Sequence, residues 1–448
     1  MSRAESNKEL YEFLKTCLDD KGIPVMNNPK FDMVTNKWTK EVFRSTLAEY
    51  ITKEKPPFPF KVWEEEKRSI KFDELSNYDY RKFIMPEERH KDVMEKFDDY
   101  KYDFKKHGIG VINGSALYNY ISDSFMNKER LHCGSYGFKA AATRWEQGDN
   151  VWGALGAIWR RVNKSKDFRK ELSHKTYEMT FRLGTYIATQ FKPTVAKAIY
   201  DMTNAKTVLD TSMGWGDRLT GFFCSNATHY IGCDPNPNTF KIYEEMIEYF
   251  KKKTNGKKTT DIYRCGAEDL WEQYEKRHGK KLENIDCAFT SPPYFSTERY
   301  NEGGTHQEDQ SWAKYSEYDA WEQKFYLPVS QMTFDSLNSK GVMLVNILDP
   351  KVKGVRYRSG DALVDMLQDN FIGQIGMRIQ QRPMGKAKFS KEDENGNIVH
   401  DKQAMNKYMK KIYVENIWSF SKDKSLKGLT LNEMTAKWNE IGTLEDFI

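Results

Sequence analysis

The side chains best suited to chemistry lie in the stretch 290–295, which reads T-S-P-P-Y-F. It follows the apolar run 285–289, which predicts a buried strand. That strand must stop at Pro292 and Pro293, because neither proline can donate to a sheet ladder. The loop therefore presents the Ser291 hydroxyl, backbone carbonyls and the Tyr294 ring at the carboxyl end of a strand. Open α/β sheets place their ligands at this end.

This loop suits a planar base that carries an exocyclic amine. Such an amine is a weak nucleophile, since its lone pair is delocalised into the ring. Two acceptors for its hydrogens, the Ser291 hydroxyl and a proline carbonyl, would favour a more tetrahedral nitrogen. Tyr294 could stack on a base held outside its duplex. Taken alone, the four residues S-P-P-Y are equally consistent with a proline-stiffened loop whose tyrosine is simply packed. The sequence pattern upstream makes a catalytic role the preferred interpretation.

A glycine-bearing turn precedes this loop in the chain. Residues 207–210 predict a strand, 210–216 read D-T-S-M-G-W-G, and a helix opens at Arg218. The next strand, 229–234, ends in Asp234, and an acid at that place can bind a ribose diol. Gly214 and Gly216 allow close approach of a ligand to the backbone. Because Asp210 would repel a pyrophosphate, an amine-bearing sulfonium nucleoside fits this turn better than a dinucleotide.

Further strands continue the pattern toward the C-terminus. Residues 261–264 predict a third strand with a loop at 265–270, and 341–348 predict a fifth strand after a helix at about 318–338. Two closely spaced strands, 370–380 and 412–420, suggest an antiparallel finish. Repeated strand–helix units predict an α/β fold with a doubly wound, mostly parallel sheet.

The N-terminal part is less informative. Residues 1–130 predict a largely helical region of unknown role, and 131–200 carry 12 basic and 5 acidic side chains. A predicted helical region at 138–163 holds Trp145, Trp152 and Trp159 at seven-residue steps, which is more typical of core packing than of a base-stacking platform. The basic residues that follow are candidates for phosphate contacts or for simple solvation: Arg160, Arg161, Lys164, Lys166, Arg169 and Lys170.

Composition bounds the class of protein. The chain has 448 residues, 39% hydrophobic and 30% charged, with a net charge of +5 and six cysteines. These values predict a globular protein of two or three domains. No apolar run approaches the roughly 18 residues that cross a bilayer. The cysteines lack paired or zinc-ligand spacing, so we expect a cytoplasmic protein without membrane or metal partners.

The motifs together resemble the amino-directed, S-adenosylmethionine-dependent DNA methyltransferases, which modify cytosine N4 or adenine N6. Their first motif is typically D-P-F-x-G-S-G, and residues 210–216 keep its Asp and both Gly positions. Their catalytic motif, (D/N/S)-P-P-(Y/F/W), is matched fully by 291–294. The segment 191–193 and the strand 413–420 look like the family's cofactor-adjacent segment and closing strand. The resemblance covers about 175–421 and implies a Rossmann-like fold.

The resemblance also implies roles for individual residues. The catalytic positions are Ser291, Pro292, Pro293 and Tyr294. The cofactor positions for S-adenosylmethionine are Phe191, Asp210, Thr211, Gly214, Gly216, Asp234, Ala267 and Glu268. The first group would hold a flipped base of DNA, as in restriction–modification systems of a bacterial or virus-infected cell. Within the second, Asp234 would bind the ribose hydroxyls, and Ala267 and Glu268 would lie at the adenine.

Several alternatives remain at this stage. Serine in the first tetrad position favours cytosine N4 over adenine N6. Related tetrads also serve in RNA base methyltransferases, and a third interpretation is a nucleic-acid-binding protein on a methyltransferase fold that has lost activity. We expect four regions: 1–130, a basic tryptophan-rich segment at 131–174, a catalytic domain at 175–421 with insertions at about 296–317 and 382–411, and a tail at 422–448.

Overall fold

The computed structural model describes residues 4–95, 100–135, 137–159, 171–185, 187–297, 299–352, 354–379, 390–392 and 398–440. Its contacts divide the chain into two compact units. Unit 1 comprises residues 1–68, 124–189 and 298–307, and unit 2 comprises residues 69–123, 190–297 and 308–448. The chain therefore passes between the units several times, and the short segment after the catalytic tetrad belongs to unit 1.

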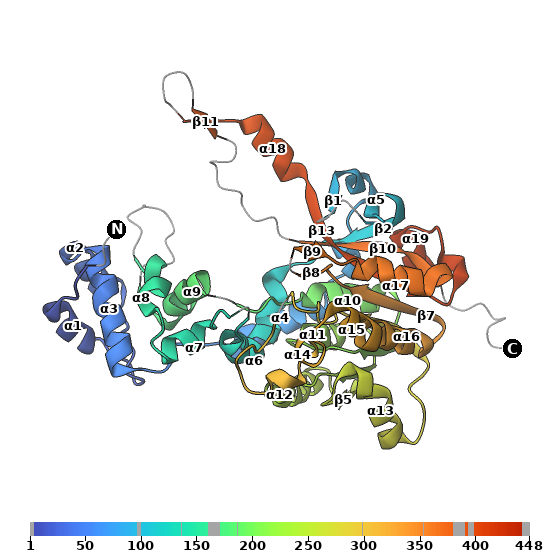
Figure 1. Ribbon diagram of the computed structural model, residues 1–448, viewed down its shortest axis with the longest axis horizontal. Coiled ribbons are helices and arrows are strands. Elements are labelled where there is room, and N and C mark those ends of the chain that lie inside the picture. Colours follow the sequence, from blue (N-terminus) through green and yellow to red (C-terminus); the bar gives the residue numbers. More distant parts are fainter. Residues whose placement is uncertain are drawn as a thin grey trace. The chain divides into compact units, whose positions relative to one another are not determined.

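Unit 2 is built on one nine-stranded sheet (Figure 1). In spatial order its strands are β2 (Gly108–Ile112), β10 (Phe371–Arg378), β13 (Ile412–Ser421), β7 (Leu337–Asn346), β6 (Ile285–Thr290), β3 (Thr207–Asp210), β4 (His229–Cys233) and β5 (Thr259–Tyr263), with β1 (Val93–Glu95) beside β13. All pairings are parallel except those of β13 with β7 and with β10. From β3 the chain winds first toward β5 and then toward β7. The order therefore reverses between β3 and β6, which defines the switch point of the sheet.

Helices cover both faces of this sheet, as a doubly wound fold requires. The helices of unit 2 include α10 (Pro193–Met202), α11 (Asp217–Phe223), α12 (Pro237–Lys253), α13 (Leu270–His278), α15 (Tyr318–Trp321), α16 (Leu327–Asp335) and α17 (Ser359–Leu367). On one face Tyr200 of α10 packs edge-on against Phe289 of β6 at 6.2 Å between ring centroids. On the other, Trp321 and Tyr326 share a core cluster with Leu209 of β3. The predicted fold class, a doubly wound and mostly parallel Rossmann-like α/β sheet with an antiparallel finish, is confirmed.

The N-terminal region contributes strands that the sequence analysis missed. It was expected to be largely helical, yet β2 pairs in parallel with β10 and β1 pairs in parallel with β13. Strand β2 has five residues and β1 has three, so neither is long enough to show a recognisable alternating pattern in the sequence. The predicted tail at 422–448 likewise contains α19 (Leu431–Trp438), whose start carries a capping box of Thr430 and Glu433.

The predicted insertion at 382–411 lies partly outside the described residues, including its turn at 395–396. Its described parts form an antiparallel pair, β11 (Ser390–Glu392) with β12 (Ile398–His400), followed by α18 (Lys402–Lys410).

Unit 1 is a helical unit with its own apolar core. Its helices include α1 (Lys8–Lys15), α2 (Asn28–Lys37), α3 (Lys40–Glu54), α7 (Ala141–Glu146), α8 (Val151–Ala154) and α9 (His174–Gly184). The described part of the helical region predicted at 138–163 contains α7, α8 and a 3-10 turn at Leu155–Ala157, with a break between α7 and α8. Gly148 and Asn150 there have φ of +67° and +46°, which no helix accommodates.

The tryptophans of this segment serve the core of unit 1, as the spacing indicated. Trp145 is 2% exposed, and its Nε1 donates to the Pro56 carbonyl at 2.7 Å. Trp152 is partly buried, with the Arg44 guanidinium 3.5 Å from its ring centroid, and Trp159 packs against the same cluster. The basic residues from Arg160 to Lys170 lie outside the described residues, so their contact with phosphates stays a prediction.

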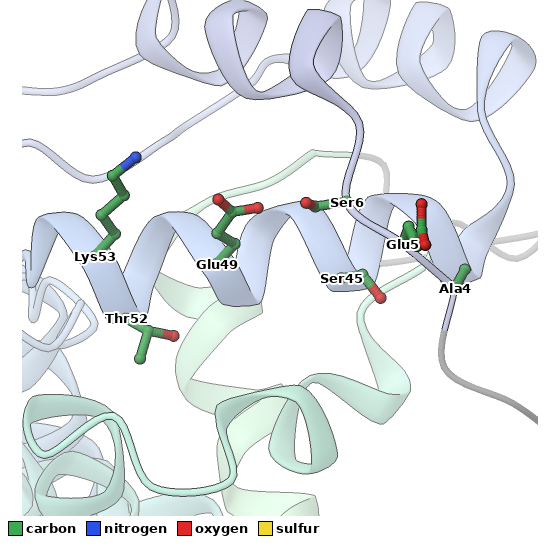
Figure 2. A pocket seen from close by; sticks show the side chains of 7 residues that line it. All are labelled: Ala4, Glu5, Ser6, Ser45, Glu49, Thr52 and Lys53. Atoms are coloured by element: carbon green, nitrogen blue, oxygen red, sulfur yellow. The ribbon is translucent and has the colours of Figure 1, made fainter.

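A surface hollow of unit 1 lies along α3 (Figure 2). Its lining residues are Ala4, Glu5, Ser6, Ser45, Glu49, Thr52 and Lys53. This lining carries two carboxylates, an ammonium and several hydroxyls, and it includes none of the residues that the motifs single out. The residues that the motifs single out all belong to unit 2.

Candidate active site

The S-P-P-Y loop leaves β6 at the switch point and is fixed by the residue that follows it. Phe295 has a φ of +50°, a conformation that is costly for a bulky side chain. Its ring is 2% exposed and packs edge-on against Tyr318, with 5.7 Å between ring centroids. Burial of this ring thus offsets the backbone strain and holds the loop in a tight turn, as is common at functional sites.

Three polar groups meet within this loop and the neighbouring strand. The Ser291 Oγ lies 2.8 Å from the Tyr294 hydroxyl, and the Tyr294 hydroxyl donates to Asn346 Oδ1 at 3.1 Å. Ser291 Oγ lies 3.4 Å from the same oxygen. Asn346 is the last residue of β7 and is 1% exposed. The sequence analysis missed this residue, because only the pairing of β7 with β6 brings it to the tetrad.

The glycine turn after β3 has the geometry that its sequence predicts. Gly214 and Gly216 have φ of +58° and +74°, so both need glycine. A Cβ added at Gly214 would meet only the Ser212 carbonyl, at 3.8 Å. The turn therefore leaves open space beside its backbone, as close approach of a ligand requires.

Hydroxyl groups join this turn to the catalytic loop. Thr211 Oγ1 donates to Thr290 Oγ1 at 3.1 Å, and Ser212 Oγ lies 2.8 Å from that same atom. Ser212 Oγ also bonds the Ser291 carbonyl at 2.9 Å. The predicted cofactor turn and the predicted catalytic loop are therefore one hydrogen-bonded assembly across the switch point.

Asp210 is placed differently from the expectation. Its side chain is fully buried and accepts from Arg218 Nε at 2.9 Å and from the Tyr230 hydroxyl at 2.7 Å. Arg218 is itself buried, and the attraction of Asp210 raises the pKa of its guanidinium despite the cost of burial. Because this cation compensates the charge of Asp210, the argument that Asp210 repels a pyrophosphate is wrong. The carboxylate instead anchors the turn, accepting also from the Ser212 N–H at 3.1 Å.

Asp234 follows β4 and faces the glycine turn. Its Oδ2 accepts from the Gly214 N–H and its Oδ1 from the Asn236 N–H, both at 3.0 Å. Thr239 Oγ1 also lies 3.5 Å from Oδ1. A carboxylate offers about four acceptor positions, so one remains for another donor. Burial raises the pKa of Asp234 to about 6, although the two backbone N–H groups act in the opposite direction.

The loop after β5 brings a second carboxylate. Ala267 is buried, and Glu268 Oε1 pairs with Lys314 Nζ at 3.2 Å. Glu268 Oε2 is buried and has no hydrogen-bond partner in the part of the chain that the structure describes. A buried acceptor of this kind is costly unless a ligand supplies a donor.

Phe191 lies beside the start of α11. The Arg218 guanidinium is 5.4 Å from the centroid of its ring, which packs edge-on against Phe289. Its carbonyl accepts from Asn119 Nδ2 at 2.7 Å.

A narrow cavity connects several of these elements. Its lining includes the predicted residues Thr211, Ala267, Pro292 and Pro293. Thr290 and residues of α16 and β7 complete it. This space therefore brings together one residue of the glycine turn, one of the loop after β5 and the two prolines of the catalytic loop. The other predicted residues do not line it: Phe191, Asp210, Gly214, Gly216, Asp234, Glu268, Ser291 and Tyr294. No cluster of His, Cys, Asp and Glu suited to a metal ion occurs among the described residues.

Neither a protein-family model nor a curated protein sequence matches the chain. Similar solved structures include a protein from Pyrococcus horikoshii that is provisionally assigned as an RNA methyltransferase, with 11% identity and a TM-score of 0.26 over 51% of this chain and 80% of that one. A SAM-dependent O-methyltransferase from Thermotoga maritima has 11% identity and a TM-score of 0.28 over 52% and 67% of the two chains. An O-methyltransferase family protein from Burkholderia thailandensis has 11% identity and a TM-score of 0.25 over 51% and 55%. At these values the similarities identify no substrate for this chain.

The strand order defines a Rossmann-like, doubly wound sheet, and the glycine turn meets the S-P-P-Y loop at its switch point. No helix in the described part of the chain is long and apolar enough to cross a membrane.

Proposed function

We propose that the protein is an S-adenosylmethionine-dependent methyltransferase that acts on an exocyclic amine of a DNA base, with cytosine N4 preferred to adenine N6. The observation that carries the proposal is the bond from Ser212 Oγ to the Ser291 carbonyl at 2.9 Å. It joins the glycine turn, where a nucleoside cofactor would bind, to the loop that suits a base amine. A Rossmann-like sheet places ligands at this switch point.

The residues of the site fit this cofactor. Asp234 keeps an acceptor position for a ribose hydroxyl, and the buried Glu268 Oε2 can accept from the adenine amine. Gly214 and Gly216 would lie against the methionine part, next to Phe191. When bound, S-adenosylmethionine supplies a methyl group activated by a sulfonium.

The protein's own groups would bind and orient the target amine. Ser291 Oγ and the Pro292 carbonyl accept its two hydrogens, which draws the lone pair out of conjugation with the ring. Tyr294 stacks on the base, and the proline-stiffened loop holds these groups in one geometry. Positioning of this kind and exclusion of water account for most of the expected rate enhancement.

The choice of DNA and of cytosine rests on the resemblance of the tetrad, with serine in its first position. A nucleoside digest tests it: the protein is incubated with labelled S-adenosylmethionine and mixed-sequence DNA, and the methylated nucleoside is identified by mass spectrometry. We expect N4-methylcytosine, and a Ser291→Ala variant as the matched control should give almost none. Label found only with structured RNA would refute the DNA proposal, and absence of cofactor binding would refute the methyltransferase proposal.

A further inference from the structure

We propose that Asn346 is a positioning residue that fixes the Ser291 hydroxyl as a hydrogen-bond acceptor for the target amine. The inference rests on the proposed function and adds to it a residue outside the catalytic motif. It starts from the three oxygens that meet beside the loop: Ser291 Oγ, the Tyr294 hydroxyl and Asn346 Oδ1.

The orientation of the Asn346 amide is set from its other side. Its Nδ2 donates to the backbone carbonyl of Asn416 in β13, at 3.2 Å. A carbonyl can only accept, so the amide must place its NH2 there and its oxygen toward the hydroxyls. Asn346 and Asn416 are 1% and 4% exposed, and the Asn416 side chain is held in turn by Glu95 Oε1 at 3.0 Å. The amide therefore cannot reverse without leaving buried groups unpaired.

The two hydroxyl protons can then be assigned. Asn346 Oδ1 only accepts, and its contact with the Tyr294 hydroxyl, at 3.1 Å, is shorter than that with Ser291 Oγ, at 3.4 Å. Tyr294 thus donates to Asn346, and Ser291 donates to Tyr294 across 2.8 Å. In the other arrangement Ser291 donates to Asn346 directly. In that case the Tyr294 hydroxyl donates to Ser291 Oγ. Both arrangements direct the serine proton into the network and leave at least one lone pair of Ser291 Oγ for an incoming amine.

This matters because serine differs chemically from the other residues that occupy the first tetrad position. The side-chain oxygen of an Asn or of an ionised Asp only accepts hydrogen bonds, whereas a free hydroxyl also donates. A Ser291 proton pointed at the amine nitrogen would engage the lone pair that has to attack the methyl group. Asn346 removes that competing arrangement, so the serine acts as an acceptor in the way the other residue types do.

The test compares variants of similar size at position 346. Asn346→Leu removes the acceptor, and Asn346→Asp keeps an acceptor oxygen. Single-turnover methyl transfer is measured for the wild type, both variants, Ser291→Ala and the double variant Asn346→Leu with Ser291→Ala. We expect Asn346→Leu to slow transfer about tenfold, the size of one net hydrogen bond, with cofactor affinity unchanged. Asn346→Asp keeps the acceptor toward the hydroxyls but loses the Nδ2 donor to the Asn416 carbonyl, so it should recover part of that loss.

The double variant separates positioning from general structural damage. If Asn346 acts through Ser291, the leucine substitution should cause no further loss in the Ser291→Ala background. An equal fractional loss in both backgrounds, or equal rates for the Leu and Asp variants, would overturn the inference. If Asn346→Leu fails to bind cofactor, the Asp variant alone decides, since a rate clearly above that of Ser291→Ala is expected and a rate as low as that of Ser291→Ala would contradict the assignment. A wild type that transfers no methyl group refutes the proposed function instead.

Discussion

Asp234 gives the site a pH dependence that can be calculated from the structure. Its pKa is raised to about 6 by burial, and its carboxylate is the proposed acceptor for the ribose hydroxyls. Protonation converts one acceptor oxygen into a donor, so cofactor and proton compete for the group. Affinity should therefore be constant well above pH 6 and fall with acidification. Below pH 6 the loss approaches about tenfold per pH unit, or 1.4 kcal/mol.

The same group should affect the stability of the cofactor-free protein in the opposite direction. The folded pKa of about 6 lies above the ordinary value of 3.8, so between these pH values the folded chain binds a proton that the unfolded chain does not. The stability contributed by this group is full below pH 3.8 and is lost as the pH rises through 6. Cofactor affinity rises over the range in which this stability falls.

Two substitutions isolate the contribution of the Asp234 carboxylate to cofactor affinity and to its pH dependence. Asp234→Ala removes the ribose acceptor and should weaken binding by roughly 1–3 kcal/mol, which is about 5- to 150-fold. Asp234→Asn removes the titration but has one acceptor oxygen for the N–H groups of Gly214 and Asn236, so one of these loses its partner. Its affinity should be low and independent of pH.

Calorimetric titration with S-adenosylmethionine from pH 5 to pH 8 measures both effects. The wild type should show the fall below pH 6 and Asp234→Asn should not. A wild-type affinity that stays flat over this range would refute the reasoning, as would the same fall in the Asn variant.

Three further substitutions test other parts of the site. Ser291→Ala should reduce turnover strongly and leave the cofactor dissociation constant nearly unchanged; full turnover would exclude its role. Arg218→Met leaves the buried Asp210 charge uncompensated and should lower the free energy of unfolding by about 3–5 kcal/mol in denaturant melts. A loss below 1 kcal/mol would show that the ion pair adds little. Thr290→Val keeps the shape of the side chain but removes the hydroxyl that joins the two loops, and should cost about 1–2 kcal/mol of stability, with weaker cofactor binding by calorimetry. An unchanged free energy of unfolding and an unchanged cofactor affinity would show that this hydroxyl does not couple the two loops.

Most of the central sheet could be predicted, because its strands other than β1 and β2 each carry a local signal. Strand β6 is a buried apolar run stopped by prolines, and β3 leads into a turn that needs two glycines. Strands β1 and β2 have no comparable signal, because they are short and their partners β13 and β10 are more than 260 residues away. Long-range pairing of this kind depends on the whole fold and leaves little trace in local sequence.

The candidate site likewise contains some residues that the sequence makes recognisable and others that it does not. Ser291, Tyr294 and Asp234 could be recognised from residue type and position after a strand. Arg218 and Asn346 could not, since one reads as an ordinary start of a helix and the other as the end of a buried strand. Their roles come from what the closed sheet places next to them: a buried carboxylate for Arg218 and two hydroxyls for Asn346. A buried polar residue ending the strand beside the catalytic strand is the signal that could have drawn attention to Asn346.

The glycine turn departs from the pattern it resembles, and the structure gives that departure a physical meaning. Pro and Phe of the D-P-F-x-G-S-G pattern are replaced by Thr211 and Ser212, whose hydroxyls both reach Thr290 Oγ1. Ser212 Oγ also donates a hydrogen bond to the Ser291 carbonyl. That carbonyl is then engaged within the protein, and the carbonyl of Pro292 remains as the backbone acceptor for a target amine. Because the same hydroxyls bridge both loops, a cofactor that orders the glycine turn would also order Ser291, so cofactor binding should precede productive binding of the base.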